Sequence, residues 1–338
     1  MELKRVVVTG MGALTPIGNT LQEYWDGLVK GTPGAAPITL FDASKFKTKF
    51  ACEVKNFDPT QFLDKKEARK IDRFTQFALV VSDEAMADAG LNRENVNPDR
   101  TGVVFGSGIG GLITFQNEVM DFAKGDGTPR FNPFFIPKMI LDIAAGQISM
   151  RHNLRGPNFA VVSACASSTN AIIEAVNLIR LGKADIIVSG GSEAVISEAG
   201  VGGFNAMKAM SERNDDPQTA SRPYDKDRDG FVMGEAAGIL ILEELEHAKA
   251  RGAKIYCEIA GGGATADAHH ITAPHPEGLG AQNVMLAALS DAGMQPGDID
   301  YINTHGTSTP LGDVAEVKAI MNVFGEHAYK LNISATKS

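Results

Sequence analysis

A repeat inside the chain restricts its fold more than any other feature of the sequence. A predicted helix that ends in Asp-Ala-Gly-Leu at residues 88–91 leads through a short loop to a predicted strand at 102–105. The same order recurs where Asp-Ala-Gly-Met at 291–294 leads to a predicted strand at 301–303. Self-similarity of this kind indicates repeated structural units. We therefore expect two similar halves that meet near residues 250–254.

The first of these halves alternates short apolar strands with amphipathic helices. In the best-defined helix, Ile172, Val176 and Ile179 recur at i, i+4 and i+7, which places them on one face. Strands that alternate with helices imply an α/β fold with a mostly parallel sheet covered by helices. The expected strands are 5–9, 102–105, 158–162, 185–188 and 238–242, and the expected helices are 72–90, 167–181 and 243–251.

Charge and composition argue against several classes of function. The 338 residues carry a formal net charge of -9, which disfavours nucleic acid as the main partner. The three cysteines include no CxxC pair, so we expect neither a disulfide framework nor a cysteine zinc site. His269, His270 and His275 have no acidic or cysteine ligand at a recognised spacing, so we predict no metal site there. With no signal peptide and no apolar run of transmembrane length, we expect no membrane association and a cytoplasmic location.

Cys165 is the strongest candidate for a reactive group. It lies where a predicted strand turns into a helix, among small residues that permit a sharp turn. The N–H groups and positive dipole end of a helix N-terminus stabilise a thiolate and can also hold an oxyanion. A free cysteine is often simply a small buried residue, and spacing alone leaves both interpretations open. For Cys52 and Cys257, in strand-like runs, the structural interpretation is favoured.

Further candidates follow the strand at 301–303. His305, among glycine and hydroxyl side chains, could donate a hydrogen bond or move a proton, or could be a turn residue bound to backbone. Thr307 and Thr309 could bind a polar arm of a ligand or cap the next helix, and capping is favoured for one of them.

Three charged residues complete this set. Asp313 and Glu316 stand at i and i+3 in the first turns of a predicted helix, where acidic residues favour the helix dipole. Lys337 ends a strand that we expect to be buried, and a buried lysine needs a carboxylate partner or a lowered pKa. Glu316 is the partner that we predict.

Two local patterns have alternative interpretations. The glycine-rich residues 106–111 (GSGIGG) superficially suggest a dinucleotide loop, but the first strand lacks GxGxxG and no acidic residue ends a matching second strand. The basic run of Lys65, Lys66, Arg69 and Lys70 is either a solvated helix face, which is usual, or a docking site for an acidic partner.

Three sequence blocks together resemble the active-site blocks of the β-ketoacyl-[acyl-carrier-protein] synthases. They are VSACASS at 162–168, NTHGTSTP at 303–310 and NISATKS at 332–338. Residues 6–18 and 211–230 are similar to the same family. The resemblance runs along the whole chain and is strongest for the elongating synthase II group.

This resemblance implies a thiolase-like fold, which is a duplicated α/β unit in five αβαβα layers. The halves would be residues 1–253, with the nucleophile, and 254–338, the first part of an incomplete second half. The family's second active-site histidine, in a Thr-Gly-His context, and its gating loop with a phenylalanine are not among the 338 residues. We expect a protein that ends at Ser338 to be unable to condense.

The resemblance also assigns roles in a decarboxylative condensation. Cys165 would accept the acyl chain, and His305 would stabilise the enolate formed from malonyl-carrier. Lys337 would be the active-site lysine, held by Glu316 with support from Asp313.

Other positions would bind substrate or partner. Thr307 and Thr309 would contact the pantetheine arm, while Ile109 and Phe204 would line the acyl pocket. The basic run would dock the acyl carrier protein, which brings acyl and malonyl thioesters. No cofactor is implied, and the family is homodimeric.

Two alternatives remain open from the sequence. A non-catalytic scaffold chain of the same fold that binds the carrier protein is disfavoured by Cys165 but favoured by the missing second histidine. A thiolase or another acyltransferase of the same fold is disfavoured by the blocks at 303–310 and 332–338, because thiolases use a second cysteine near the chain's end.

Overall fold

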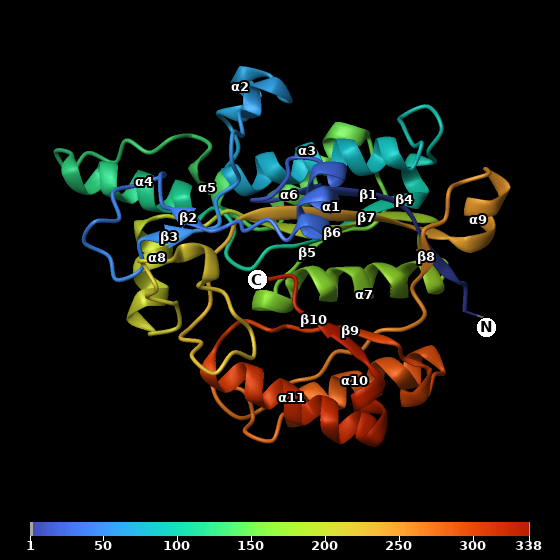
Figure 1. The fold of residues 1–338 in the computed structure, drawn as a ribbon. Helices are drawn as coiled ribbons and strands as arrows, with labels where there is room; N and C mark the ends of the chain where they lie inside the picture. The colour runs from blue at the N-terminus through green and yellow to red at the C-terminus, as the bar shows by residue number, and fades with distance from the viewer. Residues whose placement is uncertain (1–2, 338) are drawn as a thin grey trace. The chain divides into compact units, whose positions relative to one another are not determined.

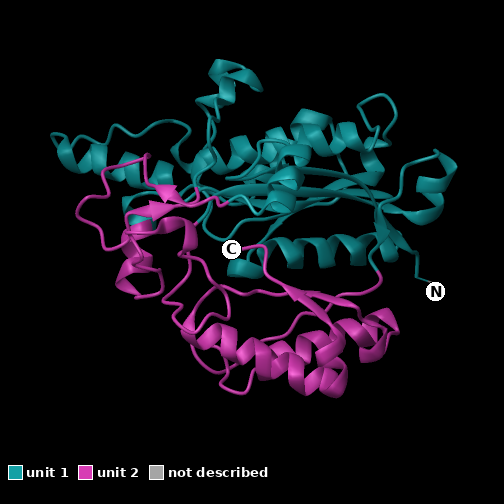
Figure 2. Cartoon of the chain, in the orientation of Figure 1, with its two compact units in different colours: residues 1–32, 53–200, 234–259 teal, residues 33–52, 201–233, 260–338 magenta. Residues whose placement is uncertain are grey.

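The computed structural model describes residues 3–337 and divides into two compact units, each built from segments distant in sequence. Unit 1 comprises residues 1–32, 53–200 and 234–259, and unit 2 comprises 33–52, 201–233 and 260–338, apart from the terminal residues not described (Figure 2). The predicted halves at 1–253 and 254–338 are defined by the repeat rather than by compactness, and they stay a prediction.

Unit 1 is built on a six-stranded sheet with the order β5-β4-β6-β7-β1-β8 (Figure 1). β4 is parallel to β5 and β6, but β7 is antiparallel to β6 and β1, and β8 is antiparallel to β1. The expectation of a mostly parallel sheet is therefore wrong for this unit, whose sheet is mixed. The strands are β1 Val6–Leu14, β4 Thr101–Gly106, β5 Asn158–Val161, β6 Ile186–Glu193, β7 Ala236–Glu244 and β8 Cys257–Glu258.

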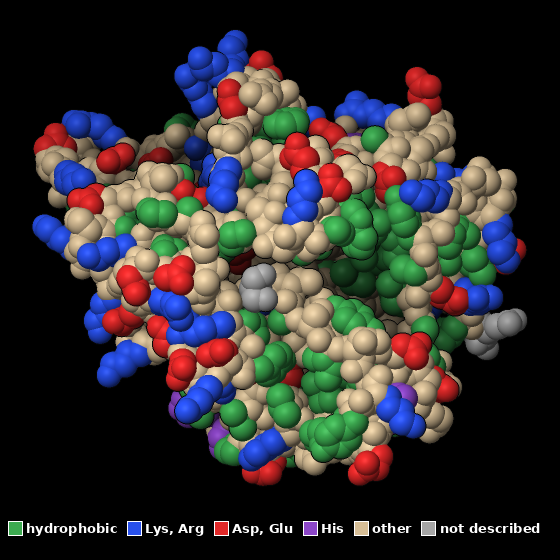
Figure 3. Space-filling view, in the orientation of Figure 1, with side chains coloured by type: hydrophobic (Ala, Val, Ile, Leu, Met, Phe, Trp, Pro, Cys, Tyr) green, Lys and Arg blue, Asp and Glu red, His purple; other side chains and the backbone are tan. Residues whose placement is uncertain are grey.

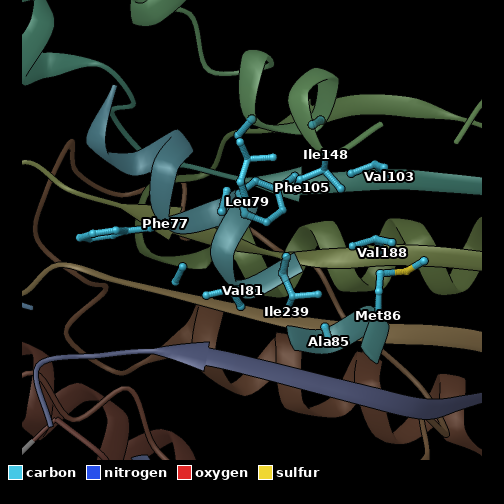
Figure 4. Packing of buried hydrophobic residues seen from close by; sticks show 14 of the residues in the cluster. Phe77, Leu79, Val81, Ala85, Met86, Val103, Phe105, Ile148, Val188 and Ile239 are labelled. Carbon is cyan, nitrogen blue, oxygen red and sulfur yellow. The ribbon is translucent and has the colours of Figure 1, made fainter. Parts of the chain in front are cut away.

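Helices cover both faces of this sheet, with α3 and α6 on one face and α7 on the other (Figure 1). Val103 and Phe105 of β4 pack in the cluster with α3, whereas Val104 packs with α7, as the two-residue period of a strand requires (Figure 4). The helices of unit 1 are α1 Leu21–Lys30, α2 Lys65–Ala68, α3 Arg73–Asp88, α4 Leu112–Lys124, α5 Phe135–Met139, α6 Ile143–His152, α7 Ser167–Arg180 and α9 Leu245–Ala250.

The apolar face predicted for the helix after Cys165 is confirmed in α7. Val176 and Ile179 are buried against the sheet, and Ile172 packs against the same cluster. The helix ends at Arg180, and Gly182 has a φ of 68°, a left-handed conformation that glycine adopts without strain.

Two strands run well past their predicted ends. β1 continues to Leu14, and β6 continues through a Gly-Gly pair to Glu193. A Cβ added to Gly12 would lie 2.5 Å from the backbone oxygen of Val81 in α3, so this glycine permits a close approach of helix and strand. The predicted helix 243–251 begins only at Leu245, because β7 extends through Glu244.

Unit 2 holds two small sheets and the helices α10 and α11. The strands β9 and β10 are parallel, with Tyr301 opposite Asn332, and β4 and β5 of unit 1 are parallel with Val103 opposite Asn158. Each unit thus contains a parallel pair formed by the strand that follows an Asp-Ala-Gly sequence and a later strand that begins with Asn. The elements that lie in unit 2 are β2 Ala36–Pro37, β3 Phe50–Ala51, α10 Leu279–Ala292, β9 Tyr301–Asn303, α11 Pro310–Phe324 and β10 Asn332–Ser334, while α8 Glu198–Ala206 spans the boundary between the units.

Candidate active site

Cys165 lies in a short 3-10 turn, Ala164–Ala166, between β5 and the first residue of α7. Cys165 is exposed, so the alternative of a small buried cysteine is wrong for this position. Ala164 has a φ of 51°, in the left-handed region where a residue with a Cβ is strained. Strained backbone of this kind is concentrated at functional sites.

Side-chain hydrogen bonds fix this strained turn. The hydroxyl of Ser167 donates to the Ala164 carbonyl at 2.7 Å and accepts from the Ser163 N–H at 2.9 Å. The Asn170 side chain donates to the Ser163 hydroxyl at 2.7 Å. The small polar residues around Cys165 therefore hold the turn as well as leaving room for it.

The sheet approaches the same turn very closely at Gly191 of β6. A Cβ added there would lie 2.1 Å from the Ser168 hydroxyl oxygen and 2.6 Å from the backbone oxygen of Gly106. The start of α7 is thus packed directly onto the ends of β4 and β6. This explains why the chain has glycine inside β6, where the sequence pattern predicted a turn.

Ile109 lies on the glycine-rich loop that follows β4, and its side chain is exposed. The backbone N–H groups of Gly108, Ile109 and Gly110 all donate to the carboxylate of Glu193. Burial raises the pKa of Glu193, although these hydrogen bonds oppose the increase. Glu193 was not among the residues predicted from the sequence.

In unit 2, His305 follows β9 and is exposed, yet the protein around its ring desolvates the imidazole. This desolvation, followed by the positive charge of Lys337, lowers the pKa of His305, and the charges of Glu316 and Asp313 oppose the decrease. The structure thus brings together four of the predicted residues. A neutral imidazole is favoured in this environment.

Glu316 holds the backbone on which His305 stands. Its carboxylate accepts from the N–H of His305 at 2.6 Å, from the N–H of Gly306 at 2.9 Å and from the Tyr224 hydroxyl at 2.9 Å. Burial, with a smaller contribution from the Glu316 charge, raises the pKa of Tyr224. Tyr224 was not predicted, because it comes from the loop before β7, 92 residues from Glu316.

Asp313 is a buried residue of the first turn of α11, and it does more than favour the helix dipole. Its carboxylate accepts from the Tyr224 N–H at 2.7 Å and pairs with Arg228 at 3.2 Å. Arg228 also donates to the carbonyl of Thr309 at 3.0 Å. Asp313 therefore joins the loop that carries Tyr224 and Arg228 to the start of α11, a link that sequence spacing did not indicate.

The remaining candidates of unit 2 differ in part from expectation. Thr309 occupies the N-cap position of α11, but its hydroxyl makes no capping hydrogen bond and instead pairs with the Thr307 hydroxyl at 2.9 Å. The expectation that Lys337 ends a buried strand is wrong, since β10 and Lys337 are exposed. Phe204, near the end of α8, packs edge-to-face on Phe231 with ring centres 5.3 Å apart.

The basic residues of the predicted docking run are all exposed on and just after the short helix α2. Figure 3 shows Lys and Arg side chains gathered over this helix at the top of the view. Lys70 lies 5.5 Å from the centre of the Phe134 ring, which is a cation–π contact. The run includes Lys65, Lys66, Arg69 and Lys70.

Residues 3–337 hold neither a membrane-spanning helix nor a metal-binding cluster. Within that range no helix combines the length and apolarity needed to cross a bilayer. The same residues contain no group of three or more His, Cys, Asp or Glu side chains placed to hold a metal ion.

Comparison with known proteins places this geometry in a family. The models of the N-terminal and C-terminal domains of β-ketoacyl synthase match residues 3–248 and 256–338. The 3-oxoacyl-[acyl-carrier-protein] synthase 2 of Synechocystis is 52% identical over 338 residues, which are 100% of this chain and 81% of that protein. The enzyme of the same name from Staphylococcus aureus is also 52% identical, over 99% of this chain and 80% of its own length.

Solved structures give the same result. A β-ketoacyl synthase from Burkholderia phymatum superposes with a TM-score of 0.90 at 35% identity, covering 99% of this chain and 81% of its own. The ketosynthase of a type II polyketide synthase, solved in complex with its acyl-carrier protein, superposes with a TM-score of 0.86 at 31% identity over the same shares. The expected thiolase-like α/β class is therefore confirmed, and the chain belongs to the β-ketoacyl synthase family.

Proposed function

We propose that this protein is the condensing enzyme of fatty-acid elongation, which joins an acyl group held on Cys165 to malonyl-acyl-carrier-protein and yields 3-oxoacyl-acyl-carrier-protein. The observation that carries the proposal is the exposed Cys165 on a strained turn at the N-terminus of the 14-residue helix α7. The helix dipole stabilises a thiolate at this position. An exposed thiolate is the nucleophile that acyl transfer between two thioesters needs.

The first half of the reaction is an acyl transfer. The Cys165 sulfur attacks the thioester carbonyl of the acyl-carrier, and the backbone N–H of Cys165 is the proposed donor to the resulting oxyanion. The bond between the acyl carbon and the carrier's sulfur then breaks, and the carrier leaves as a thiol after taking up a proton. The acyl group remains on Cys165 as a thioester.

The second half begins with malonyl-carrier. The bond to its carboxylate breaks, CO₂ leaves, and the electron pair passes into an enolate to which the imidazole N–H of His305 donates a hydrogen bond. The enolate carbon attacks the acyl thioester, and the Cys165 sulfur leaves. In this proposal Glu316 and Asp313 position His305, Lys337 supplies positive charge, and Thr307 and Thr309 bind the pantetheine arm.

The partners belong to the proposal as well. The exposed basic run at α2 fits an acidic carrier protein, since a positive patch on a chain of net charge -9 provides local charge complementarity. A homodimer is supported by β5, an edge strand of the described sheet on which Phe159 is 38% exposed, because exposed strand edges favour pairing with a second chain. Ile109 and Phe204 are the proposed acyl-pocket residues, and the cytoplasm is the proposed location.

The function is tested by acylation. The protein is incubated with a long-chain acyl-carrier thioester, and the adduct is located by mass spectrometry of peptides. We expect acylation at Cys165 that Cys165→Ala abolishes. Cys257→Ala is the matched control, because Cys257 is also exposed and lies in unit 1, and it should leave acylation unchanged. An adduct on Cys257, or none, would contradict the proposal and favour a non-catalytic scaffold.

A further inference from the structure

A half-buried carboxylate at the end of β6, that of Glu193, organises the loop that carries Ile109. One oxygen of Glu193 accepts from the N–H of Gly108 at 2.7 Å and of Ile109 at 2.9 Å. The other accepts from the N–H of Gly110 at 3.0 Å and from the Ser107 hydroxyl at 3.3 Å. Three consecutive backbone donors thus converge on a single side chain.

The same carboxylate lies beside the nucleophile's turn. A Cβ added to Gly108 would lie 2.9 Å from a carboxylate oxygen of Glu193 and 3.5 Å from the carbonyl oxygen of Ala164, the residue before Cys165. Gly108 is therefore fitted between Glu193 and this turn. A displacement of Glu193 would release the loop next to the position where the acyl chain is attached.

A carboxylate is well suited to this task because an ionised carboxyl group only accepts hydrogen bonds and can take several donors at once. A hydrogen bond to a charged acceptor raises the equilibrium constant for ordering of the loop roughly ten- to a hundredfold. Burial of Glu193 raises its pKa, so the group that holds the loop takes up a proton at a higher pH than an exposed glutamate does.

We propose that Glu193 is a positioning residue that sets the acyl chain-length selectivity of the enzyme by fixing Ile109 at the wall of the acyl pocket. This inference rests on the proposed function, in which Cys165 is acylated and Ile109 lines the pocket. A long acyl chain contacts the pocket wall, whereas a short chain ends before it. Release of the loop therefore slows acylation by long chains more than acylation by short chains.

The test compares Glu193→Gln with the wild type. Glutamine has the same shape, but its NH₂ group cannot accept, so at least one loop N–H loses its acceptor. The rates of Cys165 acylation by a long-chain and a short-chain acyl-carrier thioester are measured from the mass of the intact protein. We expect the ratio of the long-chain to the short-chain rate to fall about tenfold or more in Glu193→Gln.

The matched control is Glu243→Gln. Glu243 is a fully buried carboxylate of β7 that accepts from Thr9, His247 and Arg251, and it touches no part of the loop. Its replacement should lower the thermal unfolding midpoint and leave the selectivity ratio within about twofold of the wild type, because it removes stability without moving Ile109.

Two further readouts separate positioning from a general structural role. Ile109→Ala should cause the same loss of selectivity as Glu193→Gln. The double variant should lose no more selectivity than the more affected single variant, because both changes act on the same wall of the pocket. The wild-type ratio should fall on acidification as Glu193 takes up its proton, and the ratio of Glu193→Gln should not. If Glu193→Gln does not fold, Glu193→Asp, which withdraws the charge from the loop by one methylene, should show the same loss.

An unchanged ratio in the folded Glu193 variant, or losses that add in the double variant, would overturn the inference. These outcomes differ from a failure of the proposed function, in which wild-type Cys165 would be acylated by neither thioester.

Discussion

The carboxylate of Glu316 provides a test of how the turn around His305 is held. One oxygen of Glu316 accepts from the N–H of His305, and the other accepts from the N–H of Gly306 and the Tyr224 hydroxyl. In Glu316→Gln one of these oxygens becomes an NH₂ group. Whichever way the amide is oriented, the N–H of either His305 or Gly306 then faces another donor.

The size of the effect follows from this count. One hydrogen bond from a backbone N–H to a charged acceptor is lost, at a cost of about 1.5–3 kcal/mol. If the ordered turn is the form that reacts, each 1.4 kcal/mol is about a tenfold loss of rate. We therefore expect Glu316→Gln to decarboxylate malonyl-carrier roughly ten- to a hundredfold more slowly. Tyr224→Phe removes a donor but leaves the carboxylate and both of its backbone hydrogen bonds, so neither N–H of the turn loses its acceptor and a smaller loss of about three- to tenfold is expected.

The assay is the release of CO₂ from malonyl-carrier, measured beside acylation of Cys165. Acylation should not change, because His305 has no part in the proposed acyl transfer. The matched control is Glu277→Gln, which removes an exposed carboxylate of unit 2 that pairs with Lys318 at 3.0 Å, and exposed pairs contribute little. Decarboxylation by Glu316→Gln at the rate of Glu277→Gln would refute the reasoning.

Two further predictions concern charge and packing. Lys337→Met removes a positive charge that lowers the pKa of His305, so the pKa of His305 should rise in this variant. On acidification, the variant should therefore lose the neutral imidazole, and with it decarboxylation, at a higher pH than the wild type does. An unshifted pH profile would contradict this. Gly191→Ala places a Cβ 2.1 Å from the Ser168 hydroxyl, and overpacking of about 1–3 kcal/mol should lower the unfolding midpoint and slow Cys165 acylation. Gly238→Ala, whose Cβ meets nothing within 4 Å, should change neither, and equal effects of the two variants would argue against the packing account.

The helices could be predicted well because their signals are local. Asp72 caps α3 by accepting from the Phe74 N–H, and Gly90, with a φ of 66°, follows the end of the helix. In α7 the apolar spacing and Gly182 fixed both the buried face and the end. Such signals lie within a few residues of the feature that they predict.

The strands were predicted less well, because glycine in this chain occurs both in turns and inside strands on which a helix packs closely. The residues that follow 5–9 and 185–188 are glycines mixed with small residues, a composition that is typical of turns. In the structure, β1 and β6 continue through these segments. At Gly12 and Gly191 the missing side chain makes room for a helix packed on the strand. Whether a helix lies there depends on tertiary structure, which a local pattern does not contain.

The candidate site divides in the same way. Cys165 and His305 stand in long blocks of small and hydroxyl residues, and these blocks could be recognised along the chain. Tyr224 and Arg228, which bind the carboxylates of Glu316 and Asp313, come from a segment that is 85 to 92 residues away. No spacing rule connects such residues, so only the folded chain reveals them.

The glycine-rich loop at 106–111 shows why a motif needs its structural context. Consecutive N–H groups after a strand are the usual cradle of a phosphate, and the sequence contains such a run. In the folded chain the N–H groups of Gly108, Ile109 and Gly110 already donate to Glu193, which comes 84 residues after Ile109. The Glu193 carboxylate thus occupies the place that a bound phosphate would take. The loop then acts as a fixed support for Ile109, and its glycines leave the space that the carboxylate and the turn of Cys165 occupy.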